Sequence, residues 1–280
     1  MTRSPAGFDG LLDDAAVFPP GNLPLGQAVH AHLTHELGAH GDLVGPLVVA
    51  QADLPALAEL TGDLPVDSLP LTITVASPDT ADLALERARS INAVRLVALE
   101  VAVPEGLAAR DVVPTLMAAV GNPVGVAVYV ELPRDERRDT LLAELATTPY
   151  LAKLRTGGVR ADLYPDESEL AGAILALTGA GVGFKATAGL HHAIRNTDPE
   201  TGFEQHGFLN LIVATDVALG GADRDEVAKW LAERDGRRLA DRVAATSPAT
   251  RQAFRSFGTC SIDEPVAELA ALGLLGEVAR

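Results

Sequence analysis

Apolar, β-branched segments alternate with Ala- and Leu-rich segments along most of this chain. The apolar segments span residues 43–50, 71–76, 93–101, 124–132, 150–158, 182–189 and 254–261. Between them lie patterns such as DTADLALERARS and ARDVVPTLMAAVG, which are typical of helices that pack on a sheet. Strict alternation of strand and helix indicates βαβ units and a parallel sheet.

Seven strands are recognisable in this way, and an eighth would close a (β/α)₈ barrel. We interpret residues 207–221 as a helix and 223–236 as a second helix, which leaves 237–245 as the place for strand seven. Residues 1–42 are interpreted as an N-terminal loop and helix that cover one end of the barrel. The sequence thus predicts a single-domain (β/α)₈ TIM-type barrel over residues 1–280. An open doubly wound sheet is the alternative, which is disfavoured because no Gly-rich phosphate loop follows the first strand.

Composition limits the partners that such a barrel can have. The formal net charge of −16 repels polyanions, so we expect no nucleic-acid binding and no binding to anionic membranes. Cys260 is the only cysteine, which fits a reducing cytoplasm, and we expect a cytoplasmic protein without a signal peptide or membrane span. A homo-oligomer is compatible with the sequence.

Charged side chains are expected inside the mouth of this barrel. Alternate residues of a strand face opposite sides, and the outer side packs on helices and must be apolar. In 124–132 the valines take the outer positions, which points Tyr129 and Glu131 inward. Burying charges against helices is costly, so the charged residues of the neighbouring strands are also expected inside. This inner set comprises Glu100, Glu131, Lys153, Arg155, Lys185 and Thr187.

The long polar segment after 182–189 is expected to cover this mouth, because long loops in barrels are usually functional. It carries His191, His192, Arg195 and His206. We predict that at least one of the three histidines reaches the lysines and helps to bind the substrate. A surface position is the alternative for each histidine taken alone.

A lysine in this setting is a candidate nucleophile. Burial and neighbouring cations both favour the neutral amine, which attacks carbonyl carbons and forms Schiff bases. Lys185 is expected beside Lys153 and Arg155 and therefore meets both conditions. Glu131 or Glu100 would shuttle protons, and Lys153 with Arg155 would hold an anion. An ion-pair network that merely closes the barrel is the alternative.

Two segments resemble parts of the deoxyribose-phosphate aldolases. The run Phe184-Lys185-Ala186-Thr187-Ala188-Gly189 resembles the strand-six motif in which that family forms its Schiff base, and Ala152-Lys153-Leu154 resembles its lysine-bearing fifth strand. The resemblance implies a class I aldolase-type barrel, a carbon–carbon lyase that acts on a small anionic carbonyl compound without a cofactor. The family also has an activating lysine on strand seven, whereas the remaining lysine here, Lys229, lies on a predicted helix. Glu131 would replace the family's aspartate.

Two other function classes stay open. A metal-dependent hydrolase or isomerase would use His191, His192 and His206 with Asp13, Asp14 or Glu131, although the ligand spacing matches no sharp motif. A non-catalytic barrel would bind a small anionic metabolite through Arg155 and Lys153. Cys260 is interpreted as a small buried thiol, and its neighbours Thr259 and Ser261 would bind an anion or cap the following helix.

Overall fold

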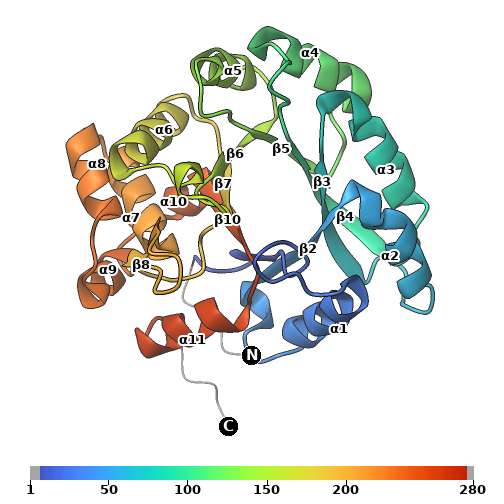
Figure 1. The fold of residues 1–280 in the computed structure, drawn as a ribbon, viewed down its shortest axis with the longest axis horizontal. Helices are drawn as coiled ribbons and strands as arrows, with labels where there is room; N and C mark the ends of the chain where they lie inside the picture. The colour runs from blue at the N-terminus through green and yellow to red at the C-terminus, as the bar shows by residue number, and fades with distance from the viewer. Residues whose placement is uncertain (1–6, 276–280) are drawn as a thin grey trace.

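Eight parallel strands close into a barrel, ringed by helices, in the computed structural model, which describes residues 7–275 (Figure 1). The barrel strands are β1 (Leu12–Asp14), β2 (Val44–Ala50), β3 (Leu69–Val75), β4 (Val94–Val101), β5 (Ala127–Glu131), β6 (Leu151–Arg155), β7 (Phe184–Thr187) and β10 (Phe254–Thr259). They follow one another around the barrel in chain order, and β10 pairs with β1 to close it. The predicted (β/α)₈ fold is confirmed.

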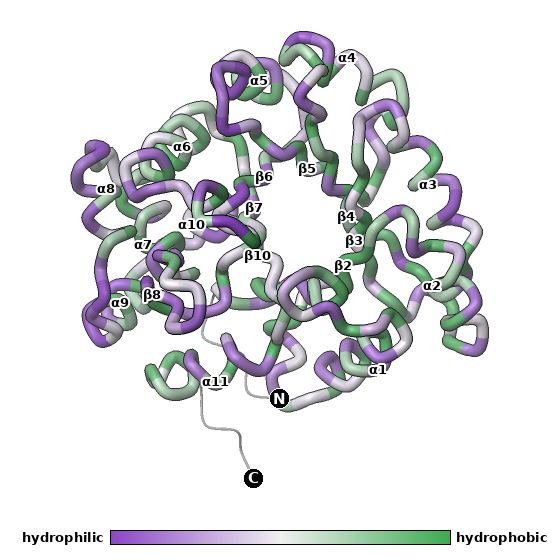
Figure 2. The backbone as a smooth tube through the Cα atoms, in the orientation of Figure 1, coloured by the Kyte–Doolittle hydropathy of each residue, from purple (hydrophilic) through white to green (hydrophobic). Residues whose placement is uncertain are grey.

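Helices follow the strands on the outside. They are α1 (Leu25–Glu36), α2 (Leu54–Leu60), α3 (Ala81–Arg89), α4 (Ala109–Val120), α5 (Arg137–Leu145), α6 (Glu167–Gly179), α7 (Phe208–Leu219), α8 (Arg224–Leu231), α9 (Gly236–Val243), α10 (Pro248–Ala253) and α11 (Asp263–Ala271). Hydrophilic residues gather on the outer parts of this ring (Figure 2). Within residues 7–275, no helix combines the length and the apolar character that a membrane crossing needs.

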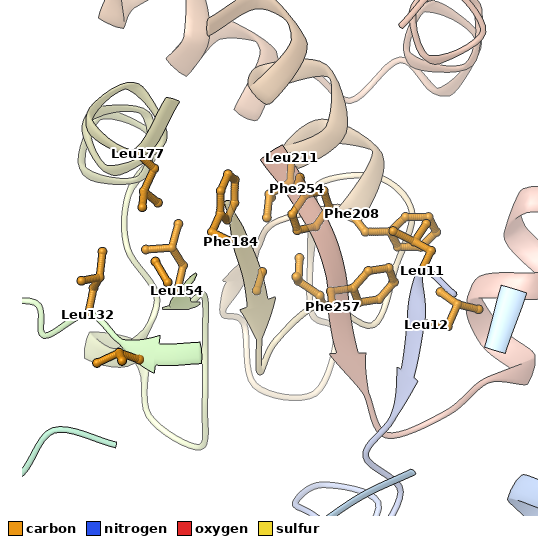
Figure 3. Close-up of a cluster of buried hydrophobic side chains, with 14 of the residues drawn as sticks. Leu11, Leu12, Leu132, Leu154, Leu177, Phe184, Phe208, Leu211, Phe254 and Phe257 are labelled. Atoms are coloured by element: carbon orange, nitrogen blue, oxygen red, sulfur yellow. The ribbon is translucent and has the colours of Figure 1, made fainter. Parts of the chain in front are cut away.

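The main core lies between the strands and the helices. Leu154 on β6 and Phe184 on β7 point away from the barrel axis toward Leu177 of α6 (Figure 3). Phe257 of β10 stacks on Phe208 of α7, with ring centroids 4.8 Å apart. Because alternate residues of a strand face opposite sides, this outer apolar set turns the polar residues between them into the barrel.

The predicted position of one strand was wrong. Residues 237–245 fall largely in α9, whose first turn is capped by Asp235 accepting from the amides of Arg237 and Arg238. The eighth strand is β1, within the segment that the sequence presented as a loop. It escapes a search for apolar runs because it has three residues and two of them are acidic. Residues 25–36 do form the expected helix, α1.

The two helices expected after the long loop are confirmed as α7 and α8. Nearly all of α7 is buried, because the helix contacts α6, α8 and α9 as well as the barrel strand β10. A helix buried on all sides is apolar all round, which explains why this stretch also resembled a strand. Between β7 and α7 the loop forms a small antiparallel hairpin of β8 (Asn196–Thr197) and β9 (Glu204–Gln205).

Candidate active site

Lys153 and Lys185 lie side by side inside the barrel. They are register partners on the adjacent parallel strands β6 and β7, and Glu131 on β5 is the register partner of Lys153. Both lysines are buried, Lys153 with 5% and Lys185 with 1% of its surface exposed. The predicted adjacency of these strands and the inward direction of their charges are confirmed.

Glu100 on β4 joins the two lysines. Its Oε2 accepts a hydrogen bond from Lys153 Nζ at 3.1 Å, and its Oε1 accepts one from Lys185 Nζ at 2.5 Å. The carboxyl group is itself buried, at 3% exposure. A buried carboxylate in contact with two amines gives them a common proton acceptor and keeps them at a fixed separation.

Asp13 on β1 is the second partner of Lys185. Its Oδ2 accepts a hydrogen bond from Lys185 Nζ and another from Ser256 Oγ at 2.7 Å. The Tyr129 ring lies on the other side, with its centroid 5.5 Å from Lys185 Nζ, at a distance typical of a cation–π contact. The role of Asp13 was missed because its strand was missed; the signal was the acidic pair that directly follows Leu11 and Leu12.

Glu131 links Lys153 to Arg155. One carboxylate oxygen lies 2.9 Å from Lys153 Nζ, and the other accepts a hydrogen bond from Arg155 Nε at 2.9 Å. Lys153, Lys185 and Arg155 are thus matched by three carboxylates, those of Glu100, Glu131 and Asp13. The cluster is electrically balanced, which reduces the cost of burying so many charges.

The expectation of a lowered lysine pKa was wrong for the unliganded protein. Burial acts to lower the pKa of Lys185, but the charges of Asp13 and Glu100 outweigh it and raise that pKa. Burial, Glu100 and Glu131 act in the same way on Lys153, whose pKa is also raised. Burial opposes the charge on Glu100, yet the two lysines lower its pKa to about 2. The resting site therefore holds protonated amines beside the ionised carboxylates of Glu100 and Glu131. Asp13 differs from these two, because burial outweighs its contacts with Lys185 and Ser256 and raises its pKa.

A cavity of about 690 Å³ opens above this cluster at the carboxyl ends of the strands. Its wall includes Glu100, Glu131, Lys153, Arg155, Thr187 and His191 among the predicted site residues, together with Arg87, Cys260 and apolar side chains such as Phe18 and Leu163. Lys185 is absent from this wall. Of the two amines, that of Lys153 therefore belongs to the residue that lines the cavity, whereas Lys185 is almost fully buried.

The ends of β6 and β7 are held at a close approach. A Cβ atom on Gly189 would lie 2.9 Å from the Cα of Gly157, and Gly189 has a φ of +72°. Ala188 also has a positive φ of 63°, which is unfavourable for a residue with a Cβ. Thr156 Oγ1 donates to the Ala188 carbonyl at 2.7 Å. This strained turn brings the start of the loop to the cavity wall.

The three loop histidines lie in different places. His191 lines the cavity and lies 3.4 Å from Cys260 Sγ through its Nδ1. His192 Nδ1 lies 2.7 Å from a Glu268 oxygen on α11. His206 is fully buried and lies 2.8 Å from the Pro165 carbonyl through Nε2 and 3.3 Å from Arg195 through Nδ1. Within the described chain, none of them forms a hydrogen bond or ion pair with Lys153 or Lys185.

This separation removes the geometric basis of the metal hypothesis. Among residues 7–275, no three His, Cys, Asp or Glu side chains are arranged to hold a metal ion. Asp14 is engaged with the buried His32, whose Nδ1 lies 3.1 Å from its Oδ2. Cys260 is a partly buried thiol, and burial raises its pKa.

In the structure, Lys153 and Lys185 lie on barrel strands with other numbers than the sequence predicted. With Leu12–Asp14 as the first strand, Lys153 lies on the sixth barrel strand and Lys185 on the seventh. The motif around Lys185 therefore does not lie on strand six, where the resemblance placed it. The strand-seven lysine that the sequence did not reveal is Lys185.

Comparisons with known proteins agree with the fold. No protein-family model matches the chain, and no curated protein matches it. Among solved structures it is similar to the deoxyribose phosphate aldolase from Aeropyrum pernix, described as a unique tetramer. The TM-score is 0.54 at 14% identity, over 96% of this chain and 93% of that chain. The likeness agrees with the closed (β/α)₈ barrel of this chain. At this identity the likeness concerns the fold, so the chemistry must be argued from the site itself.

Proposed function

We propose that this protein is a carbon–carbon lyase of the class I aldolase type, acting on a small anionic carbonyl compound through a lysine Schiff base. The observation that carries the proposal is the position of Lys153 in the cavity wall, with Glu100 connecting it to Lys185. Lys153 is the nucleophile, in place of the Lys185 that the sequence favoured, because it is the one of the two lysines that lines the cavity. The strand count supports this choice, since the aldolase resemblance implies a Schiff-base lysine on strand six and an activating lysine on strand seven.

The chemistry starts with removal of a proton from Lys153. Glu131, 2.9 Å from Nζ, accepts it, and the neutral amine attacks the substrate carbonyl carbon. The carbonyl oxygen leaves as water and an iminium ion forms. A carboxylate then takes the proton of the substrate's β-hydroxyl group, the carbon–carbon bond breaks, and its electron pair moves into the iminium to give an enamine. Protonation and hydrolysis of the enamine release the second product and free the lysine.

Lys185 is a positioning residue in this scheme. Its protonated amine contacts Glu100 and Asp13, and it is buried beside Lys153 on the neighbouring strand. By binding Glu100, Lys185 holds the carboxylate that also contacts Lys153.

Borohydride trapping tests the proposal. Incubation with aldehydes and keto acids followed by reduction is expected to add one substrate-sized mass per chain, mapped to Lys153 by peptide mass spectrometry. Lys153→Arg keeps the charge, cannot form this imine and is expected to lose the adduct. Lys185→Met is expected to slow its formation at Lys153, whereas Lys229→Met, an exposed lysine of α8, serves as the matched control. An adduct on Lys185, or none in a folded wild-type protein, contradicts the assignment.

A non-catalytic binder is the second candidate, favoured by the raised pKa of both lysines, since protonated amines bind anions well. Metabolite binding without turnover or trapping would support it. A cytoplasmic location and a homo-oligomer also stay proposals; the similar aldolase is described as tetrameric. Light scattering during gel filtration tests the oligomeric state.

A further inference from the structure

Arg155 lies at the cavity with one edge of its guanidinium in use. Its Nε donates to Glu131, while Nη1 and Nη2 have no hydrogen-bond or ion-pair partner within residues 7–275. The side chain is 36% exposed and lines the cavity. Glu131 therefore fixes the orientation of the arginine and leaves its outer edge, which binds a carboxylate through two parallel hydrogen bonds, available to a ligand.

The carboxyl group of Glu131 also holds the Arg155 guanidinium near the amine of Lys153. Lys153 and Arg155 are two residues apart on one face of β6, and both contact Glu131, through different oxygens at 2.9 Å each. An anion held by Arg155 is therefore close to a carbonyl carbon that reacts with Lys153. A carboxylate bonded directly to the carbonyl carbon is the arrangement that places an anion next to the reacting carbon.

The corner of the barrel that commonly binds phosphate is built differently here. Barrel enzymes often hold phosphate at the loops after strands seven and eight and at a nearby helix N-terminus. Thr259 Oγ1 donates to the Ser261 carbonyl, so its proton is used within the turn, and Ser261 Oγ accepts from the Glu264 amide in the helix cap. The first turn of α11 also carries Asp263 and Glu264. These charges disfavour a phosphate at this corner.

The remaining cavity wall adds a second constraint. Among the described residues that line it, the lysine and arginine side chains are Arg87, Lys153 and Arg155. His191 near the acidic corner is mostly neutral, because burial lowers its pKa. Phe18, Val159 and Leu163 add apolar surface. This wall fits a substrate whose negative charge is next to its carbonyl, at the Arg155 side of the cavity.

We infer that the substrate is a 2-oxo carboxylic acid whose carboxylate is held by the outer edge of Arg155, rather than a phosphorylated sugar. The inference rests on the proposed function for the role of Lys153, but the carboxylate clamp is a separate property. It explains why an arginine follows the lysine by two residues on the same strand face, where a structural role in the ion cluster needs only its Nε.

Trapping with matched probes tests the inference. The protein is incubated separately with pyruvate, with its neutral analogue pyruvamide and with dihydroxyacetone phosphate, and borohydride then reduces any imine to a stable adduct. Intact mass spectrometry gives the probe concentration at which half of the protein carries the adduct. We expect the half-maximal concentration of pyruvate to be at least tenfold lower than that of either other probe. Arg155→Gln and Arg155→Lys should reduce the preference for pyruvate over pyruvamide, the ratio of their two half-maximal concentrations, at least tenfold. Arg160→Gln, which removes an exposed arginine outside the cavity, is the matched control and should change neither.

Calorimetric binding without reductant separates the two proposals. Adducts that form with equal preference for pyruvate and pyruvamide, or that favour dihydroxyacetone phosphate, overturn the carboxylate clamp and leave the Schiff base intact. Pyruvate binding that disappears in a folded Arg155 variant, with no adduct in the wild type, supports the clamp and overturns the Schiff base. Absence of both pyruvate binding and adducts overturns both.

Discussion

Replacing Glu100 by Gln tests how much the buried ion cluster depends on its central carboxylate. The lysines lower the pKa of Glu100 from its ordinary value of 4.5 to about 2. Each pKa unit corresponds to about 1.4 kcal/mol, so the ionised carboxylate stabilises the folded protein by about 3 kcal/mol at neutral pH. Gln leaves Lys153 with Glu131 and Lys185 with Asp13, but the buried cluster gains one uncompensated positive charge.

The sign of the pH dependence follows from the lowered pKa. The Glu100 contribution is fully present above about pH 4.5 and is lost as the pH falls toward 2. Urea unfolding of wild type and Glu100→Gln should therefore differ by about 3 kcal/mol at pH 7, and by progressively less below pH 4.5. The exposed Glu59→Gln on α2 is the matched control, expected within about 0.5 kcal/mol. A difference below about 1 kcal/mol at pH 7, or one that stays constant down to pH 3.5, would refute the electrostatic account.

Two further predictions concern pH and the loop. Because the pKa of Lys153 is raised, the fraction of neutral amine grows about tenfold per pH unit, and the trapping rate should rise about tenfold from pH 7 to 8 and about tenfold again from pH 8 to 9; a plateau below pH 8 would contradict this. His206→Ala should reduce the free energy of unfolding by roughly 2 kcal/mol, since it empties a buried site and removes contacts to Arg195 and the Pro165 carbonyl. Trapping by the folded His206 variant should be unchanged, and the exposed His30→Ala is its control in urea unfolding. Loss of trapping with normal stability would place His206 in the active site instead.

The barrel was predictable because most of its strands are buried on their helix side and carry apolar residues there. Alternation also placed Glu131, Lys153 and Lys185 correctly inside, since a charge against the helix layer would be costly. The first strand was not predictable by the same rule. β1 is three residues long, and its Asp13 is stabilised by Lys185 and Ser256, which are 172 and 243 residues away in sequence. Such long-range compensation has no local signal.

The side-chain partners of the loop histidines were equally unpredictable from the sequence. The adjacent His191 and His192 look like a pair, yet one lies against Cys260 in the cavity and the other against Glu268 on α11. The prediction of a lowered lysine pKa was wrong for a related reason. The sequence showed cations next to Lys185, and it did not show that the carboxylates of Asp13 and Glu100 contact its amine.

The sequence analysis missed both β1 and a lysine on strand seven, and the two omissions have one cause. Without β1, the barrel lacks one strand, the sequence places that strand at 237–245, and Lys185 is then counted on strand six with no lysine on strand seven. With β1 in place, the count moves by one, so that Lys153 lies on the sixth barrel strand and Lys185 on the seventh. Asp13, which belongs to β1, also contacts Lys185. The strand count and the surroundings of Lys185 therefore both depend on three residues near the N-terminus.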